Sequence, residues 1–140
     1  MIDWLQQSWH TWRKPKTLGQ RGEDAAARFL KRLGYTILVR SDRSILGELD
    51  IVAVDGETIV FVEVKTRVSD SAGLPAEAVD DAKQQKLTRL ALAYLKRNDL
   101  LEYSARFDVI GILWPDSSKK PEITHYINAF EATGQFQMHS

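Results

Sequence analysis

The sequence predicts an α/β domain in which a mixed central sheet is flanked by helices, with elements in the order α-β-β-β-α-β-β. Three observations support this fold class. Two segments, residues 20–33 and 77–97, carry apolar residues at helical spacing. Five further segments have the character of short strands, and two of them flank Asp55-Gly56, a pair that favours a hairpin turn. The chain has 140 residues, 44% of them hydrophobic, which is enough for one core.

The beginning of the chain, residues 1–16, stands apart as a Trp-rich amphipathic arm, and residues 17–140 form the predicted domain. Apolar side chains of the arm recur at helical spacing: Ile2, Leu5, Trp9 and Trp12. Pro15 then ends the pattern. Two interpretations are open: a short helix docked on the domain, or an arm that binds a partner or a membrane surface.

The elements of the domain follow in chain order. The first helix, residues 20–33, has one apolar face, and Gly34 suits its C-terminal end because glycine readily adopts a left-handed backbone. The next three strands are expected over residues 35–40 and on both sides of the Asp55-Gly56 turn. The remaining segments are a loop at 66–76, a helix at 77–97 and strands at 107–114 and 122–127.

Composition excludes several classes of protein. Without cysteine there is no disulfide framework and no thiolate metal site, and neither a basic leader nor a long apolar run is present, so we expect a cytoplasmic protein. The formal net charge is zero, with 19 basic and 19 acidic residues. Residues 1–43 nevertheless hold nine Lys and Arg against four Asp and Glu. Any basic surface is therefore a local patch.

Charged residues interrupt the most hydrophobic stretch of the chain, residues 47–65. Strand side chains alternate between the two faces of a sheet. With a two-residue loop, one face carries Glu48, Asp50, Val52, Val54, Phe61, Glu63 and Lys65, and the other carries Leu49, Ile51 and Ala53. A three-residue loop with a bulge would disturb this arrangement. The charged members of the first face gather at the open end of the hairpin.

Carboxylates this close repel one another and raise each other's pKa unless a cation intervenes. Asp50 and Glu63 would hold Mg²⁺ or Mn²⁺ through their oxygens. Lys65, two residues beyond Glu63, would then stabilise the attacking water or the developing negative charge. The alternative is an ordinary solvated strand face or a set of cross-strand ion pairs.

The segment GELDIVAVDGETIVFVEVKTR resembles the YraN-like family of small bacterial predicted endonucleases, within the PD-(D/E)xK superfamily that includes proteins related to Holliday junction resolvases. The similarity covers residues 19–130, where GQRGEDAAARFLKRLGY, AKQQKLTRLALAYL, RFDVIGI and NAF follow in the expected order. The resemblance implies a restriction-endonuclease-like core, with Asp50 and Glu63 as metal ligands and Lys65 as the catalytic lysine. One departure is Leu49, which stands where the superfamily's name has a proline.

The resemblance also implies roles for neighbouring residues. Glu23 matches an acidic residue that the first helix brings towards the metal, although an acid early in a helix also favours the helix dipole. Glu48 is either a second carboxylate behind the metal ligands or a charge at the strand edge. Lys83 and Gln84 match polar positions near the phosphate, and a solvated helix face is the alternative. We expect Asp108 to be structural.

The leading hypothesis is a Mg²⁺- or Mn²⁺-dependent phosphodiester hydrolase that acts on DNA, including branched or single-stranded forms. A basic rim would contact phosphates without reading sequence; its candidates are Arg21, Arg40, Arg43, Arg67, Lys83 and Lys86. A junction resolvase would need two active sites, hence a homodimer through the final strand or the Trp-rich arm. Two alternatives are a non-catalytic module that binds DNA structures or a protein partner, and an adaptor anchored by residues 1–16.

Overall fold

The structure is a computed structural model that describes residues 14–71 and 73–133, so the predicted arm lies outside the described residues except for residues 14–16. Its elements are α2 (Leu18–Arg32), β1 (Thr36–Ser44), β2 (Gly47–Asp55), β3 (Thr58–Arg67), the 3-10 helix η1 (Pro75–Ala78), α3 (Asp81–Arg97), β4 (Ala105–Leu113) and β5 (Glu122–Phe130). This order confirms the predicted α-β-β-β-α-β-β succession. None of the described helices is long and apolar enough to cross a membrane.

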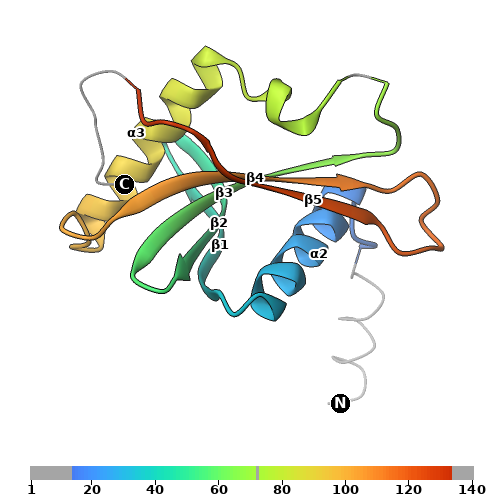
Figure 1. The fold of residues 1–140 in the computed structure, drawn as a ribbon. Helices are drawn as coiled ribbons and strands as arrows, with labels where there is room; N and C mark the ends of the chain where they lie inside the picture. Colours follow the sequence, from blue (N-terminus) through green and yellow to red (C-terminus); the bar gives the residue numbers. More distant parts are fainter. Residues whose placement is uncertain (1–13, 72, 134–140) are drawn as a thin grey trace, which may run out of the picture.

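The strands form one mixed sheet with the spatial order β1-β2-β3-β4-β5. β3 and β4 are parallel, whereas the other neighbouring pairs are antiparallel. A parallel pair needs a crossover connection, and α3 lies within it. Figure 1 shows α3 on one face of the sheet and α2 on the other. The predicted mixed sheet flanked by helices is therefore confirmed.

Each helix covers its own hydrophobic core. The core beneath α3 includes Leu49, Val52, Phe61, Leu87, Leu95 and Phe107. The core beneath α2 includes Ala26, Leu30, Ile51, Ala53, Val62 and Ile112. β2 and β3 contribute to both cores, and this explains why their apolar runs are almost continuous rather than strictly alternating.

The first helix is fixed at both ends by local hydrogen bonds. At its start, Thr17 and Gln20 form a capping box in which each side chain accepts a hydrogen bond from the other's backbone N–H, at 2.8 and 3.1 Å. At its end, Gly34 has φ of +94°, which confirms the predicted glycine stop. The helix begins two residues earlier than predicted because Thr17 supplies the cap.

The β2–β3 hairpin has a two-residue loop, the first of the two alternatives, and it lies one residue later than the Asp55-Gly56 pair predicted. Asp55 pairs with Thr58, so Gly56 and Glu57 form the turn, and the ladder continues to the pair Ile51–Val62. No pair of these two strands is found beyond Ile51 within the described residues. β2 therefore leaves β3 at Asp50, the position of the predicted metal ligand, while it continues to pair with β1.

The predicted alternation of faces is wrong at this point of β2. Leu49 lies in the core beneath α3 together with Val52, whereas Ile51 and Ala53 lie beneath α2. The strict period of two holds only while β2 is in register with β3. The neighbouring strand β1 is also irregular here, because its residue Ser41 has φ of +50°.

Several boundaries differ from the prediction for identifiable reasons. β1 continues to Ser44 although residues 41–44 are polar, because this part pairs with β2. The second helix begins at Asp81 rather than at residue 77, since the Asp80 side chain accepts a hydrogen bond from the Lys83 N–H and caps it. β5 extends to Phe130, where it still pairs with β4.

Asp108 is structural, as predicted. Its carboxylate is fully buried in β4. It contacts the Nε2 atom of His125 at 2.8 Å and accepts hydrogen bonds from the Nε atom of Arg106 at 3.0 Å and the backbone N–H of Asn128 at 2.9 Å. The bonds with His125 and Asn128 tie β4 to β5.

Candidate metal centre

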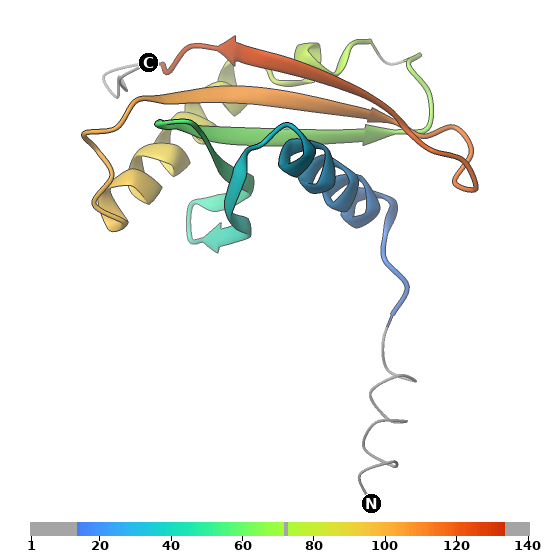
Figure 2. The ribbon, with the colours of Figure 1, turned by 60° about the horizontal axis from the view of Figure 1, so that its bottom comes forward.

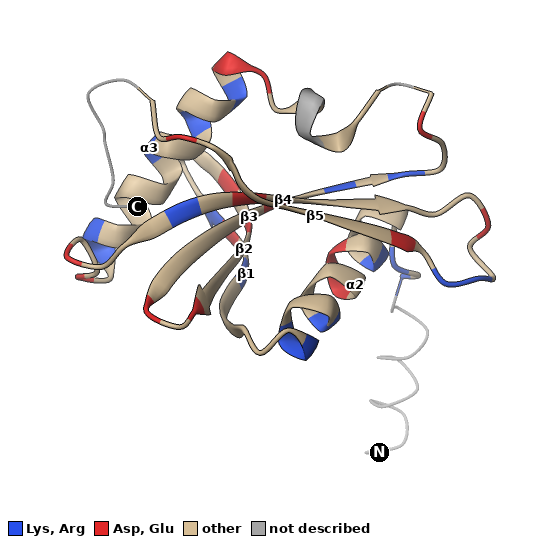
Figure 3. Cartoon of the chain, in the orientation of Figure 1, with Lys and Arg blue, Asp and Glu red and all other residues tan. Residues whose placement is uncertain are grey.

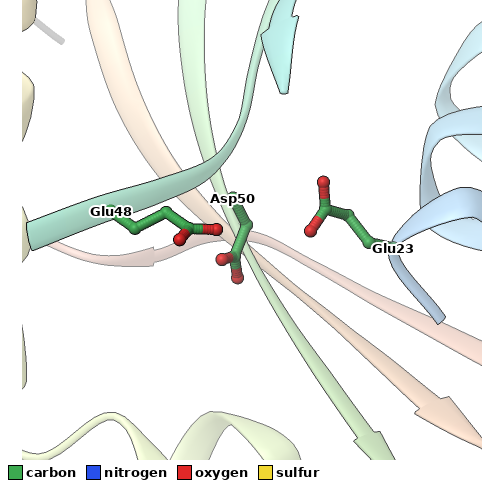
Figure 4. A group of neighbouring side chains, drawn as sticks. All are labelled: Glu23, Glu48 and Asp50. Carbon is green, nitrogen blue, oxygen red and sulfur yellow. The ribbon is translucent and has the colours of Figure 1, made fainter. Parts of the chain in front are cut away.

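Three carboxylates meet where β2 separates from β3. Glu23 comes from α2, and Glu48 and Asp50 come from β2; one oxygen of each lies within 4.8 Å of the others. Figure 4 shows the Glu23 side chain reaching from the helix towards the two strand residues. Carboxylate oxygens are the ligands that Mg²⁺ and Mn²⁺ prefer. The cluster is thus a candidate site for a hard divalent cation.

A glycine brings α2 close enough for Glu23 to join this cluster. An ideal Cβ atom on Gly22 would lie 1.8 Å from the Oγ1 atom and 2.8 Å from the Cβ atom of Thr66 on β3. Only glycine fits this contact. The next residue, Glu23, is then held by β1: the Ser41 hydroxyl donates to it at 3.0 Å, and the Arg40 Nε atom lies 3.4 Å from it.

Asp50 is the least compensated of the three carboxylates. It accepts a hydrogen bond of 2.9 Å from the backbone N–H of Val64. Burial and then the charge of Glu63 raise the pKa of Asp50 to about 7; the Val64 N–H opposes this rise, Glu23 adds to it, and Lys83 also opposes it. A raised pKa means that the ionised form lacks sufficient positive charge nearby. A divalent cation would supply that charge, so the donor set fits a metal ion.

Glu63 lies beside this cluster but outside it. Its side chain is buried, at 7% exposure, and its Oε1 atom lies 3.4 Å from the Lys83 Nζ atom and 3.9 Å from the Lys65 Nζ atom. The three oxygens within 4.8 Å belong to Glu23, Glu48 and Asp50. The structure therefore brings Asp50, Glu63 and Lys65 near one another, and it adds Glu23 and Glu48 as close neighbours of Asp50.

Glu48 is itself a member of the carboxylate cluster, whereas the sequence indicated a position behind the metal ligands or at the strand edge. Its carboxylate accepts a hydrogen bond of 2.9 Å from the Nε atom of Arg43 and faces an open cleft of about 410 Å³. The cleft is lined by Thr17, Gly19, Gln20, Glu23, Ser41, Arg43, Glu48, Asp50, Val64 and Thr66. Sequence spacing placed Glu48 beside Asp50, but on the face of Val52. The cleft next to α2 was not predicted because the alternation of faces is lost between Leu49 and Val52.

Two predicted site residues form hydrogen bonds with backbone segments outside the carboxylate cluster. The Gln84 Nε2 atom donates to the Val79 carbonyl at 3.0 Å, next to the start of α3. Arg67 donates to the Gly73 carbonyl at 3.0 Å and fixes the loop after β3. Neither residue lines the cleft beside the carboxylates.

The predicted basic rim is divided in the same way. Arg21 donates to the Ser117 carbonyl and lies over the Trp114 ring, and Arg40 pairs with the acidic residues of α2. Arg43, Lys83 and Lys86 remain close to the centre or the adjoining hairpin. Basic residues recur along α3, which carries the two lysines (Figure 3). The rim near the centre thus comes from β1 and α3.

Comparison with known proteins places the chain among bacterial relatives of similar length. Residues 22–112 match the model described as Uncharacterised protein family UPF0102. A UPF0102 protein of Geobacter sulfurreducens is 52% identical over 118 residues, covering 83% of this chain and 90% of that protein. One from Rhodopirellula baltica is 45% identical over 120 residues, covering 84% and 72%.

A third relative, from Caldanaerobacter subterraneus subsp. tengcongensis, is 43% identical over 116 residues, covering 82% of this chain and 95% of that protein. These names give a family and no activity, so the resemblance to nucleases stays a prediction. The match spans α2 to β4 and includes all three clustered carboxylates. The chain belongs to the UPF0102 family.

Proposed function

We propose that the protein is a Mg²⁺- or Mn²⁺-dependent phosphodiester hydrolase that acts on DNA. The observation that carries the proposal is the meeting of Glu23, Glu48 and Asp50 within 4.8 Å. The lysine pair at Glu63 supports it. Phosphodiester hydrolysis needs carboxylates to hold the metal and cations to offset their charge, because the carboxylates alone would repel the phosphate of the substrate.

Glu23, Glu48 and Asp50 would hold the metal, with Glu63 beside them. A bound Mg²⁺ or Mn²⁺ supplies Lewis acidity towards a phosphoryl oxygen. Within the chain, the Val64 N–H orients the Asp50 carboxylate, and Ser41 orients Glu23. These second contacts hold the ligands ready before the metal binds.

Lys65 and Lys83 would approach a bound phosphate from two different elements. Lys65 and Lys83 approach the same oxygen of Glu63 from β3 and α3. Their ammonium groups would stabilise the negative charge that develops on the phosphoryl group, and Glu63 keeps both in position. Arg43, at the rim of the cleft, would contact a neighbouring phosphate without reading the base sequence.

Cleavage assays test this proposal. End-labelled four-way junction, flap, single-stranded and duplex DNA would be incubated with Mg²⁺, with Mn²⁺ and with chelator. We expect metal-dependent cleavage that Asp50→Asn abolishes and that Lys65→Ala lowers about 100-fold or more. Lys96→Ala, which changes an exposed lysine in the last turn of α3, is the matched control.

Equal traces of cleavage in the wild type and in both site variants would indicate a contaminating nuclease and contradict the proposal. DNA binding without cleavage of any of these substrates would favour the alternative, a non-catalytic DNA-binding module. Isothermal titration with Mn²⁺ provides a second measurement, since wild type should bind the ion and Asp50→Asn should not.

A further inference from the structure

The end of the β1–β2 hairpin carries two exposed apolar residues beside the metal centre. Ile45 is 105% exposed and Leu46 is 51% exposed. They form the turn between the two strands, a position where polar residues usually prevail. Figure 2 shows this end of the hairpin standing off the sheet between α2 and α3. An isoleucine side chain that is wholly exposed to water does not stabilise the folded chain. Its exposure therefore indicates a contact with another molecule.

The turn is held in a fixed position. The Ser44 hydroxyl accepts from the Leu46 N–H at 3.2 Å and donates to the Gly47 carbonyl at 3.3 Å. Gly47 has φ of +140°, and an ideal Cβ atom there would lie 2.8 Å from the Lys86 Cε atom. The hairpin therefore leans closely on α3. Ile45 is presented on an ordered support, which lowers the entropy cost of inserting it into a ligand.

Two cationic groups lie near the apolar turn. The Arg43 side chain, two residues before Ile45, is 83% exposed, and Lys86 of α3 approaches Gly47. Arg43 and Glu48, which flank the turn in sequence, both line the cleft of the metal centre. A ligand that contacts the turn and the cleft together must offer anionic groups next to flat apolar ones. DNA has this chemistry, with phosphates for the cations and base faces for the aliphatic side chains.

We propose that Ile45, supported by Leu46, is a wedge that enters between neighbouring bases of DNA whose backbone lies in the cleft. The inference rests on the proposed function, because it takes DNA as the ligand. Ile45 is three residues from Glu48 and five from Asp50. At ~3.3 Å per strand residue these separations are at most about 10–17 Å. With ~3.4 Å per nucleotide, the opened step lies within about three to five nucleotides of the phosphate at the centre.

The wedge also defines the class of substrate. Unstacking a base step is least costly where the DNA is already unpaired, branched or flexible, as at TA and CA steps. Such structures at this distance from the cut should be preferred over a uniform duplex. The preference would arise from deformability, since a side chain inserted between stacked bases contacts their faces and not their edges.

A fluorescence experiment tests the wedge independently of cleavage. Full-length Asp50→Asn protein, which should not cut, would be titrated into a series of duplexes that each carry one 2-aminopurine at successive positions. We expect fluorescence to rise on binding at one or two positions. On the same background, Ile45→Ser should abolish the rise and weaken binding about tenfold. Ile127→Ser, which changes a 59% exposed isoleucine on β5 at the opposite edge of the sheet, should alter neither.

Each outcome separates the wedge from the nuclease. A fluorescence rise that depends on Ile45 supports the wedge even if the wild-type protein cuts no DNA. The lack of cleavage would contradict the proposed hydrolase activity but not the wedge. Cleavage by wild type with no fluorescence change in bound Asp50→Asn overturns the wedge and leaves the hydrolase. A rise that Ile45→Ser retains also overturns the wedge. Binding to vesicles of anionic phospholipid that requires Ile45, without DNA binding, would overturn it by assigning the turn to a membrane surface.

Discussion

At the scale of single residues, the ionised form of Asp50 lowers the stability of the folded chain. Burial and the neighbouring charge of Glu63 raise its pKa to about 7, against ~3.9 in an unfolded chain. The folded state therefore binds the proton more tightly than the unfolded state does. The resulting stability is fully present below pH ~4 and is lost as the pH rises towards ~7.

Asp50→Asn should remove this pH dependence, because the amide oxygen still accepts the Val64 hydrogen bond but carries no charge. At pH 8 without metal, we expect the free energy of unfolding of the variant to exceed that of wild type by on the order of 2–4 kcal/mol. The difference should disappear near pH 4. Urea denaturation across this range measures it, and a difference independent of pH would contradict the assignment.

Asp108 is a buried carboxylate of the opposite kind. Burial raises its pKa, but hydrogen bonds from His125, Arg106 and the Asn128 N–H outweigh burial and lower it. Its stabilising contribution is therefore present above the unfolded pKa of ~3.9 and is lost as the pH falls through the lower folded pKa.

For Asp108→Asn we expect a loss of about 3 kcal/mol in the free energy of unfolding at pH 7, because Arg106 and His125 lose their charged partner. The loss should be smaller at pH 3, because below pH ~3.9 the unfolded wild-type chain binds a proton at the same carboxylate. Denaturation curves at both values test this, with Glu122→Gln on the surface of β5 as the control. An equal loss at pH 7 and pH 3 would argue against the ionic role.

At the scale of elements, the approach of α2 to β3 decides whether Glu23 reaches the metal centre. In Gly22→Ala, the new methyl group would overlap the Cβ atom of Thr66 as well as its hydroxyl, so rotation of the threonine does not relieve the clash. We expect the helix to shift, at a cost of about 1–3 kcal/mol, and Mn²⁺ binding to weaken at least tenfold.

Gly19→Ala is the matched control for the stability measurement in this experiment. Gly19 also lies in α2, but a Cβ atom there would meet only the Thr17 hydroxyl, at 3.9 Å. This variant should gain up to ~1 kcal/mol from helix propensity. Thermal unfolding and Mn²⁺ titration compare the two variants. Unchanged stability and metal binding in Gly22→Ala would show that the helix contact does not position Glu23.

At the scale of the whole molecule, the formal net charge of zero makes local lysines decisive for binding to nucleic acid. Lys83 lies at the metal centre and Lys86 beside the turn of the β1–β2 hairpin. We expect Lys83→Gln and Lys86→Gln each to reduce the slope of log affinity against log salt by about 1, equally for all sequences. Fluorescence anisotropy measures the slope, with Lys96→Gln as the control. Unchanged slopes would remove α3 from the DNA path.

The chain order, a hairpin turn near Asp55-Gly56 and the glycine stop at Gly34 could be predicted from sequence, because local patterns determine them. The extension of β1 to Ser44 could not, since a polar segment becomes a strand there by pairing with β2. Asp50 lies next to Glu63, as expected. Its grouping with Glu48 and Glu23 as well arises from two long-range facts, the end of the β2–β3 ladder and the contact of Gly22 with Thr66.

The crossover between β3 and β4 also affects the order of assembly during synthesis. Glu23, Glu48, Asp50 and Glu63 all precede α3 in the chain, so these four carboxylates leave the ribosome before the helix does. Glu63 is buried in the finished protein, and α3 covers this face of the sheet. The same helix carries Lys83, whose ammonium group lies 3.4 Å from Glu63. Lys65, on β3 itself, is the first cation beside Glu63, at 3.9 Å. Docking of α3 then supplies both the cover and a second, nearer counter-charge, so burial of this acid and its full compensation occur in one step.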